Sequence, residues 1–256
     1  MTGETTMRRD SEDARGGHVA GTGRLRARPS AAPAPSGEGR PGETALDLEG
    51  GGRAALLYVP PSYEPARPAP LALMLHGAGG SAAHGLGILR AQADAAGLIL
   101  LAPASRRQTW DAIGGQFGPD VAAIDRALAH VFERFAVDPD RLAVGGFSDG
   151  ASYALSLGIT SGDLFGHILA FSPGFTAHDA RHGRPRVFVS HGTRDAVLPI
   201  DACSRRIVPA LRHAGYDVTY QEFDGPHTVP AHIAQEALGW FLGAGQGEGR
   251  SEAGGK

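Results

Sequence analysis

The stretch Leu142-Ala143-Val144-Gly145-Gly146-Phe147-Ser148-Asp149-Gly150-Ala151-Ser152-Tyr153-Ala154-Leu155 joins two apolar segments through a turn of small residues. Gly146, Ser148 and Gly150 fit the pattern G-x-S-x-G, in which a serine occupies a sharp strand-to-helix turn. Such a turn forces the serine backbone into a sparsely populated conformation, and a side chain two residues before or after it would collide. The pattern predicts that Ser148 is a nucleophile, although a plain glycine-rich turn fits the same five residues.

Composition and charge exclude several classes of protein. The chain has 256 residues, of which 42% are hydrophobic, and a formal net charge of −3. These values fit a globular protein with one large core and give no basic surface for nucleic acid. The single cysteine, Cys203, excludes an internal disulfide and a multi-cysteine metal site.

No apolar run reaches the ~20 residues of a membrane-spanning helix, so we expect no membrane span. The pair Arg8-Arg9 is followed by charged residues where an export signal requires an apolar core. The chain is therefore expected to reside in the cytoplasm.

Apolar strands alternate with helices between residues 54 and 242. Strands are predicted at 54–60, 71–76, 98–103, 141–146, 167–171, 186–190 and 217–223, and helices at 81–96, 119–135, 149–158, 200–213 and 229–242. Several of the strands are apolar throughout, which is typical of strands covered on both faces. The alternation predicts an α/β fold with a mostly parallel central sheet and helices on both faces.

Both ends of the chain differ from this pattern. Residues 1–22 are polar and aperiodic, and we expect a disordered tail. Residues 23–242 are predicted to form one domain, and 243–256 a flexible, glycine-rich tail. Within the domain, residues 23–28 are predicted to form a short edge strand with Leu25 as its large apolar anchor, and 29–42 a loop or linker.

Chemically distinctive residues follow the predicted strands, where the loops of a parallel sheet gather. The segment His76-Gly77-Ala78-Gly79-Gly80 follows one strand, and its flexible backbone can turn N–H groups toward a bound oxygen. We expect the N–H groups of Ala78 and Asp149 to form an oxyanion hole, with the positions on either side of Ala78 as the alternatives for the donor in the 76–80 loop. A phosphate-binding loop or a plain turn is the alternative for this segment.

An acid and a base follow two later strands. Asp195, in His191-Gly192-Thr193-Arg194-Asp195, is predicted to orient the catalytic imidazole, with Asp201 and Asp179 as weaker candidates. His227, in Asp224-Gly225-Pro226-His227, is predicted to be the base that takes the Ser148 proton. His191 is expected to have a structural role within the turn that contains Asp195. Five other histidines are weaker candidates for the base than His227: His130, His178, His182, His213 and His232.

Two further residues are predicted to contact substrate. Gly77 lies in the glycine-rich loop, and Trp110 follows the strand at 98–103 in Thr109-Trp110-Asp111. An indole there would line the acyl or alcohol side of the pocket, and a core tryptophan is the equal alternative.

These motifs resemble those of the α/β-hydrolase superfamily, and most of all its phospholipase/carboxylesterase-type serine esterases. The resembling residues are Leu57-Tyr58-Val59-Pro60-Pro61, Leu75 to Gly80, Val137-Asp138-Pro139, Gly146 to Gly150, His191 to Asp195 and Gly225-Pro226-His227. The chain is similar also to polyhydroxybutyrate-depolymerase-like and feruloyl-esterase-like enzymes. The order Ser148, Asp195, His227 is the order of the triad in that superfamily.

The resemblance implies hydrolysis of small or medium carboxylic esters through an acyl-enzyme, without metal or cofactor. The expected partner is a small-molecule ester, and the sequence leaves the oligomeric state open. Asp149 departs from those carboxylesterases, which often carry glutamine after the nucleophile. Other chemistry on the same scaffold is the second interpretation: polyester depolymerase, feruloyl esterase, peptidase or C–C bond hydrolase. A non-catalytic ligand-binding member of the superfamily is the third.

Overall fold

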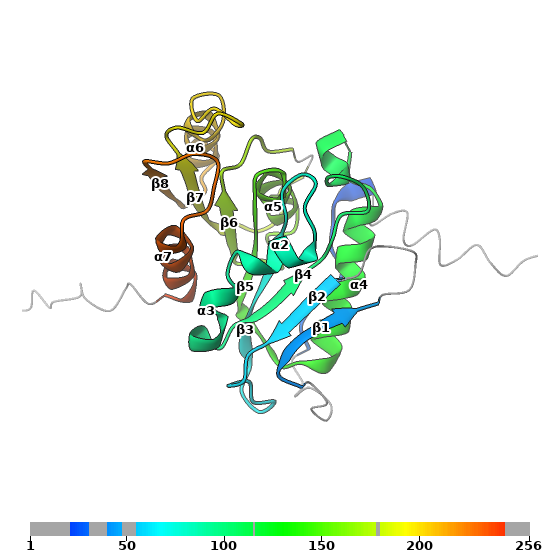
Figure 1. Ribbon diagram of the computed structural model, residues 1–256. Helices are drawn as coiled ribbons and strands as arrows, with labels where there is room; N and C mark the ends of the chain where they lie inside the picture. The colour runs from blue at the N-terminus through cyan, green and yellow to red at the C-terminus, as the bar shows by residue number, and fades with distance from the viewer. Residues whose placement is uncertain (1–20, 31–39, 48–54, 115, 178–179, 244–256) are drawn as a thin grey trace, which may run out of the picture.

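The computed structural model describes residues 21–30, 40–47, 55–114, 116–177 and 180–243. Within them, eight strands form one sheet in the order β1-β2-β4-β3-β5-β6-β7-β8 (Figure 1). The strands are β1 Gly42–Leu46, β2 Ala55–Val59, β3 Ala69–Leu75, β4 Ile99–Ala102, β5 Val137–Phe147, β6 His167–Phe171, β7 Arg186–Gly192 and β8 Val218–Phe223. Strands β3 to β8 run parallel, whereas β2 is antiparallel to both of its neighbours.

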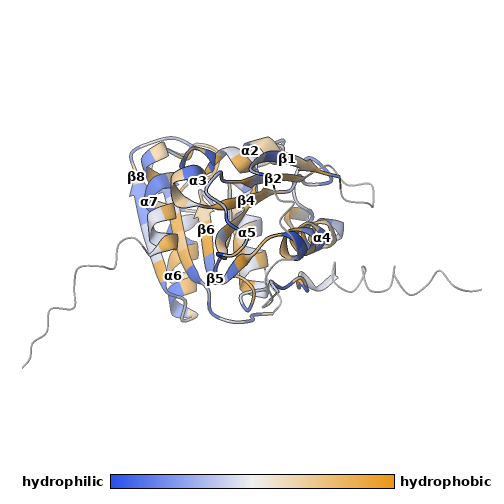
Figure 2. Cartoon of the chain, turned by 90° about the horizontal axis from the view of Figure 1, so that it is seen from below, coloured by the Kyte–Doolittle hydropathy of each residue, from blue (hydrophilic) through white to orange (hydrophobic). Residues whose placement is uncertain are grey.

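Helices cover both faces of this sheet, as the sequence predicts. The helices are α2 Ala82–Gly87, α3 Arg90–Ala96, α4 Pro119–Arg134, α5 Asp149–Thr160, α6 Ser204–His213 and α7 Ala231–Leu242, with a short 3-10 helix η1 at Asp111–Gly114. Side chains of β3 alternate between two apolar clusters: Leu71 and Leu73 pack with α4, α5 and α6, and Ala72 packs with α2, α3 and α7. Figure 2 shows the hydrophobic central strands between these helix layers.

The mostly parallel, helix-covered sheet confirms the predicted fold class. Most predicted elements are present with shifted ends; the largest shifts are in β5, which begins at Val137, and in α6, which begins at Ser204. The single helix predicted at 81–96 is wrong, because the structure has two helices there, separated at Leu89, whose φ of −119° and ψ of 2° are not helical. A Cβ on Gly85 would lie 2.6 Å from the carbonyl oxygen of Met74, so α2 needs glycine to pack this closely on β3.

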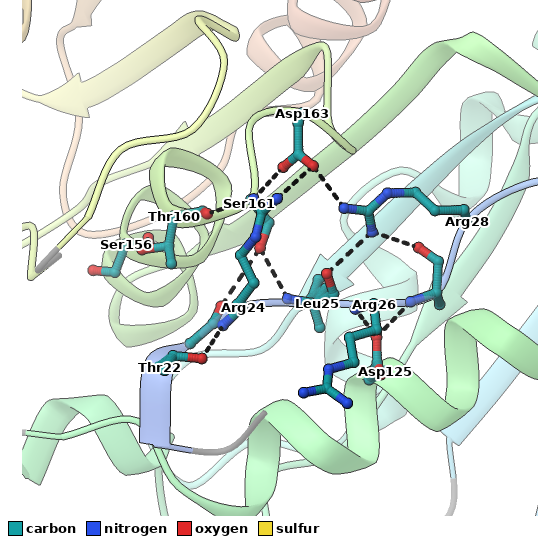
Figure 3. A network of polar contacts seen from close by, with 12 residues as sticks. Thr22, Arg24, Leu25, Arg26, Arg28, Asp125, Ser156, Thr160, Ser161 and Asp163 are labelled. Atoms are coloured by element: carbon teal, nitrogen blue, oxygen red, sulfur yellow. Dashed lines mark hydrogen bonds and ion pairs between the residues drawn. The ribbon is translucent and has the colours of Figure 1, made fainter. Parts of the chain in front are cut away.

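The edge strand predicted at residues 23–28 is also wrong. Residues 24–30 have no regular secondary structure, because the N–H groups of Arg26 and Ala27 donate to the carboxylate of Asp125 on α4 instead of to a neighbouring strand (Figure 3). Leu25 is nevertheless buried, as its role of apolar anchor requires. The edge strand on this side of the sheet order is β1, and its first residue, Gly42, lies in the stretch predicted to be a loop. Residues 1–20, 31–39 and 244–256, on which parts of the tail and linker predictions fall, lie outside the described residues.

Candidate active site

Ser148 lies in the turn between β5 and α5, with φ 58° and ψ −121°. A residue other than glycine rarely adopts this conformation, and the surrounding structure must hold it there. The N–H of Ser148 donates to the carbonyl oxygen of Phe171 on β6 at 2.9 Å. A Cβ on Gly146 would lie 2.6 Å from the Leu75 carbonyl oxygen, and one on Gly150 would overlap the same oxygen. Both glycines are therefore required by the packing of the turn against β3.

Asp195 and His227 meet Ser148 at the carboxyl ends of the neighbouring strands. Asp195 follows β7, and its Oδ1 accepts hydrogen bonds from the N–H groups of Val197 at 2.9 Å and Leu198 at 2.8 Å. His227 follows β8; its Nδ1 is 2.5 Å from Asp195 Oδ2, and its Nε2 is 2.9 Å from Ser148 Oγ. One continuous chain of hydrogen bonds thus joins three side chains that are up to 79 positions apart in the sequence.

The charge on Asp195 determines which atoms donate and which accept in the hydrogen bonds that join Asp195, His227 and Ser148. Burial opposes ionisation of Asp195, but the N–H of Leu198 and the imidazole of His227 outweigh it, so the pKa of Asp195 lies below its ordinary value. An ionised carboxylate only accepts, so His227 Nδ1 carries the hydrogen and donates it to Asp195. The free lone pair of His227 is then on Nε2, and it accepts the hydrogen of the Ser148 hydroxyl.

The glycine-rich loop after β3 lies against this serine. A Cβ on Gly77 would lie 3.3 Å from the Cβ of Ser148. The N–H of Gly79 donates to Gln108 and that of Gly80 to Gly77, at 2.7 and 3.0 Å. These two N–H groups are therefore used within the protein.

Asp149, the first residue of α5, lies on the other side of the nucleophile in the chain. The first N–H groups of a helix have no partner within it. The side chain of Asp149 accepts a hydrogen bond from the hydroxyl of Thr109 at 2.7 Å. This contact ties the first turn of α5 to the loop that follows β4.

His76 supports the glycine-rich loop, a role that the sequence analysis missed. Its side chain is buried; Nδ1 lies 2.7 Å from the carbonyl oxygen of Gly77, and Nε2 accepts the N–H of Ser105 at 3.0 Å. The imidazole therefore joins the loop after β3 to the loop after β4. The signal was the histidine directly before the glycines, but its partner Ser105 is 29 positions away.

Trp110 is a core residue rather than an open wall of the site. Its side chain is 1% exposed, and its ring stacks on Tyr153 with centroids 5.2 Å apart. Its Nε1 donates to the carbonyl oxygen of His76 at 2.8 Å. The indole contributes to the lining of a cavity of about 890 Å³ formed by residues 106–111 and 116–120. Because so little of its surface is exposed, most of the indole packs against core residues and only a small part of it faces the cavity.

The rival acids and bases that the structure describes do not contact Ser148 by a hydrogen bond. Asp201 forms an exposed ion pair with Arg205, and Asp179 and His178 fall outside the described residues. His213 and His232 are exposed on their helices, and His130 and His182 are partly exposed. His191 is different: it is fully buried beside Asp195, with its Nε2 3.2 Å from Asp195 Oδ2.

In the part of the chain that the structure describes, no cluster of three or more potential ligands is arranged to hold a metal ion. None of the helices found there is long and apolar enough to cross a membrane.

Comparisons with known proteins find similarity to esterases. The model of the Phospholipase/Carboxylesterase family matches residues 121–238, which include all three linked side chains. Feruloyl esterase C of Emericella nidulans is 29% identical over 161 residues, covering 59% of this chain. The match spans 57% of that relative, so the chain covers little more than half of its length.

Solved structures share the fold. The esterase PE8 superposes with a TM-score of 0.57 at 21% identity, over 72% of this chain and 95% of the other. The fluorophosphonate-binding serine hydrolase FphF of Staphylococcus aureus superposes with a TM-score of 0.64 at 13% identity, over 79% and 99%. The sheet order, the strained serine turn and these similarities show that the chain has the α/β-hydrolase fold.

Proposed function

We propose that this protein is a serine hydrolase that cleaves carboxylic esters of small or medium acyl chains. The observation that carries the proposal is the unbroken chain from Ser148 Oγ through His227 to Asp195, with links of 2.9 and 2.5 Å. A serine hydroxyl is a weak nucleophile until a neighbouring base removes its proton as it attacks. His227 is within hydrogen-bonding distance of the proton that must move.

In the proposed first half-reaction, Ser148 Oγ attacks the ester carbonyl carbon while His227 Nε2 takes the hydroxyl proton. The imidazolium that forms keeps its Nδ1–H on Asp195, whose ionised carboxylate stabilises the positive charge. The carbonyl oxygen becomes an oxyanion, which accepts hydrogen bonds from the backbone N–H groups of Ala78 and Asp149. When the tetrahedral intermediate collapses, the C–O bond to the alcohol breaks, and His227 returns its proton to the departing oxygen.

The second half-reaction uses the same groups with water. His227 Nε2 takes a proton from water, whose oxygen attacks the carbonyl carbon of the acyl-enzyme. Collapse of the second tetrahedral intermediate breaks the bond to Ser148, which recovers its proton from His227. The products are the carboxylic acid and the free enzyme, and no group outside the protein and water is consumed.

A second candidate function differs from the first in the acyl group of the substrate. The similarity to a protein named Feruloyl esterase C favours an aromatic acyl group as the alternative to a short aliphatic one. Rates with p-nitrophenyl acetate, butyrate and octanoate, compared with methyl ferulate, separate the two. A preference for methyl ferulate over the aliphatic series would replace the aliphatic proposal. The cytoplasmic location remains a prediction from the sequence.

A fluorophosphonate probe tests the nucleophile itself. Ser172 is a matched control, because it is the other non-glycine residue with positive φ among the described residues, at 51°, and it is also buried. We expect mass spectrometry to locate the label on Ser148, and Ser172→Ala to label like the wild type. A label on another residue would overturn the triad, and labelling without ester turnover would point to a different hydrolase chemistry.

A further inference from the structure

His191 is a buried imidazole that the mechanism above does not use. It lies near the end of β7, four residues before Asp195, and is fully inaccessible to solvent. Its Nδ1 is 2.6 Å from the hydroxyl of Ser204, the first residue of α6. Its Nε2 is 2.8 Å from the carbonyl oxygen of Leu198 and 3.2 Å from Oδ2 of Asp195.

The partners of His191 determine where its hydrogen lies. The carbonyl oxygen of Leu198 only accepts hydrogen bonds, and so does the ionised carboxylate of Asp195. Nε2 must therefore carry the hydrogen and share it between these two oxygens. The Ser204 hydroxyl then donates to the unprotonated Nδ1, so that both ring nitrogens are satisfied in one tautomer.

We propose that His191 is a positioning residue for the catalytic site, whose Nε2–H holds the same Asp195 oxygen that receives the His227 Nδ1–H. Ser204 fixes the ring in the tautomer that this contact requires. The inference rests on the proposed function, because it assigns His191 a part in orienting the base of that reaction. His191 touches neither substrate nor Ser148 in this role; it acts through Asp195.

The carboxylate of Asp195 shows why this contact matters. Oδ1 accepts hydrogen bonds from the N–H groups of Val197 and Leu198, and Oδ2 lies 2.5 Å from His227 Nδ1 and 3.2 Å from His191 Nε2. Four donors from its own loop, from β7 and from the loop after β8 hold the carboxylate in one orientation. Without His191, Oδ2 of Asp195 keeps only the contact with His227. The orientation of the carboxylate and the negative charge beside His227 would then both change.

The charged groups around this cluster leave His191 neutral. Burial lowers the pKa of His191 against the opposing effect of Asp195, so the ring stays uncharged while His227 gains and loses its proton. Glu222 on β8 also faces His191, but its carboxylate is bonded to Arg205, at 2.9 and 2.7 Å. Cys203, which faces Asp195, has a pKa raised by burial and by that carboxylate, and therefore stays protonated.

The test compares His191→Phe, which keeps a ring without a donor, with His191→Gln, which keeps an N–H donor. The exposed His213 on α6 provides the matched control His213→Phe. We expect His191→Phe to lower kcat by about 10- to 100-fold with little change in KM, since a displaced base costs rate rather than binding. Loss of the donor leaves more negative charge on Asp195, so the acidic limb of the kcat/KM profile moves upward by about 0.5 pH unit.

His191→Gln should move both values back toward the wild type, and His213→Phe should leave both unchanged. A purely structural role predicts a lower melting temperature with an unmoved acidic limb. A folded His191→Phe variant with the wild-type kcat and acidic limb would overturn the proposal.

Nitrogen-15 NMR of the unmodified protein supplies a second readout that needs neither a variant nor ester turnover. We expect His191 to be protonated on Nε2 alone over the whole pH range in which the protein is active. A proton on Nδ1 instead would overturn the proposal, even if His191→Phe failed to fold. Because NMR follows the rings directly, it gives its answer even if p-nitrophenyl esters are not hydrolysed, an outcome that would count against the proposed function alone.

Discussion

The turn at residues 146–150 and the N-terminal segment at residues 21–30 are both held in one conformation, but by opposite means. The turn is defined by sterics among neighbouring residues, because a Cβ on Gly146 would lie 2.6 Å from the carbonyl carbon and oxygen of Gly150. The N-terminal segment is held by residues far along the chain. The carboxylate of Asp163 accepts hydrogen bonds from the side chains of Arg24 and Arg28 (Figure 3). The carboxylate of Asp125 accepts hydrogen bonds from two backbone N–H groups of the segment.

The difference shows which kind of constraint can be detected in a sequence. A steric demand within five residues dictates which amino acids stand next to each other. A contact such as the one between Arg24 and Asp163 joins positions 139 residues apart, and each residue alone is an ordinary surface charge. The two regions should therefore respond differently to substitution, with the turn controlling activity and the segment controlling local stability.

The largest effect is expected at the tip of the turn. Ser148→Ala should lower kcat by about 10⁴- to 10⁶-fold, because the nucleophile is lost while the proposed oxyanion hole remains. Ser148→Gly should abolish activity as well but raise the free energy of unfolding by about 1 kcal/mol, since glycine adopts φ 58° without strain. Steady-state kinetics and urea unfolding measure the two quantities. Turnover within tenfold of the wild type in either variant would refute the assignment of the nucleophile.

Gly150→Ala should produce the next largest effect, on stability and activity together. The added methyl group would overlap the Leu75 carbonyl oxygen, so β3 and α5 must move apart. We expect a loss of about 3 kcal/mol in unfolding free energy and about 100-fold in kcat. Gly239→Ala on α7 is the control, because no atom lies within 4 Å of its added Cβ, and it should raise stability slightly. Equal melting temperatures for the two variants would contradict the steric explanation of the turn.

Leu25→Ala should weaken the N-terminal segment without affecting catalysis. The side chain is 1% exposed, and its truncation should cost about 2 kcal/mol, at the low end for a buried leucine because the segment can detach on its own. Trypsin should then cleave faster after Arg24 and Arg26, while cleavage after the exposed Arg107 provides an internal control. A large fall in kcat would mean that the segment supports the active site after all.

The smallest effect is expected for Asp163→Asn, and it should depend on pH. Burial disfavours the ionised carboxyl, but hydrogen bonds from Arg24 and Arg28 outweigh it and hold the pKa of Asp163 below its ordinary value. A depressed folded-state pKa stabilises the protein above the ordinary pKa of Asp, near 3.9, and this stability is lost as the pH falls through the folded-state value. Because the pairs are about one-third exposed, the loss should be below about 1 kcal/mol.

Cleavage within residues 21–30, followed with an acid-tolerant protease at a pH below the folded-state pKa of Asp163 and with trypsin at pH 8, checks this dependence. The wild type and Asp163→Asn should differ at pH 8 and converge in acid. A difference that is the same at both pH values would exclude the carboxylate as the cause.

The sequence determined much of the site because its requirements are local. The turn around Ser148, the strands that end before Asp195 and His227, and the alternation of strands and helices all follow from neighbouring residues. The single helix expected at 81–96 was wrong, although its glycines were visible, because the close packing of Gly85 on β3 depends on a strand outside the window.

The roles of three buried side chains required the tertiary structure. His76 and Trp110 join loops whose partners lie 29 and 34 positions away, and no local pattern distinguishes such a histidine or tryptophan from a pocket residue. His191 lies four positions from Asp195, yet its partner Ser204 belongs to the next helix. The sequence by itself predicted the class of fold and the candidate residues at the strand ends, because apolar periodicity and tight turns are properties of consecutive residues. Which polar atoms lie within 3 Å of one another was decided by packing, because a hydrogen bond depends on distance in space and not along the chain.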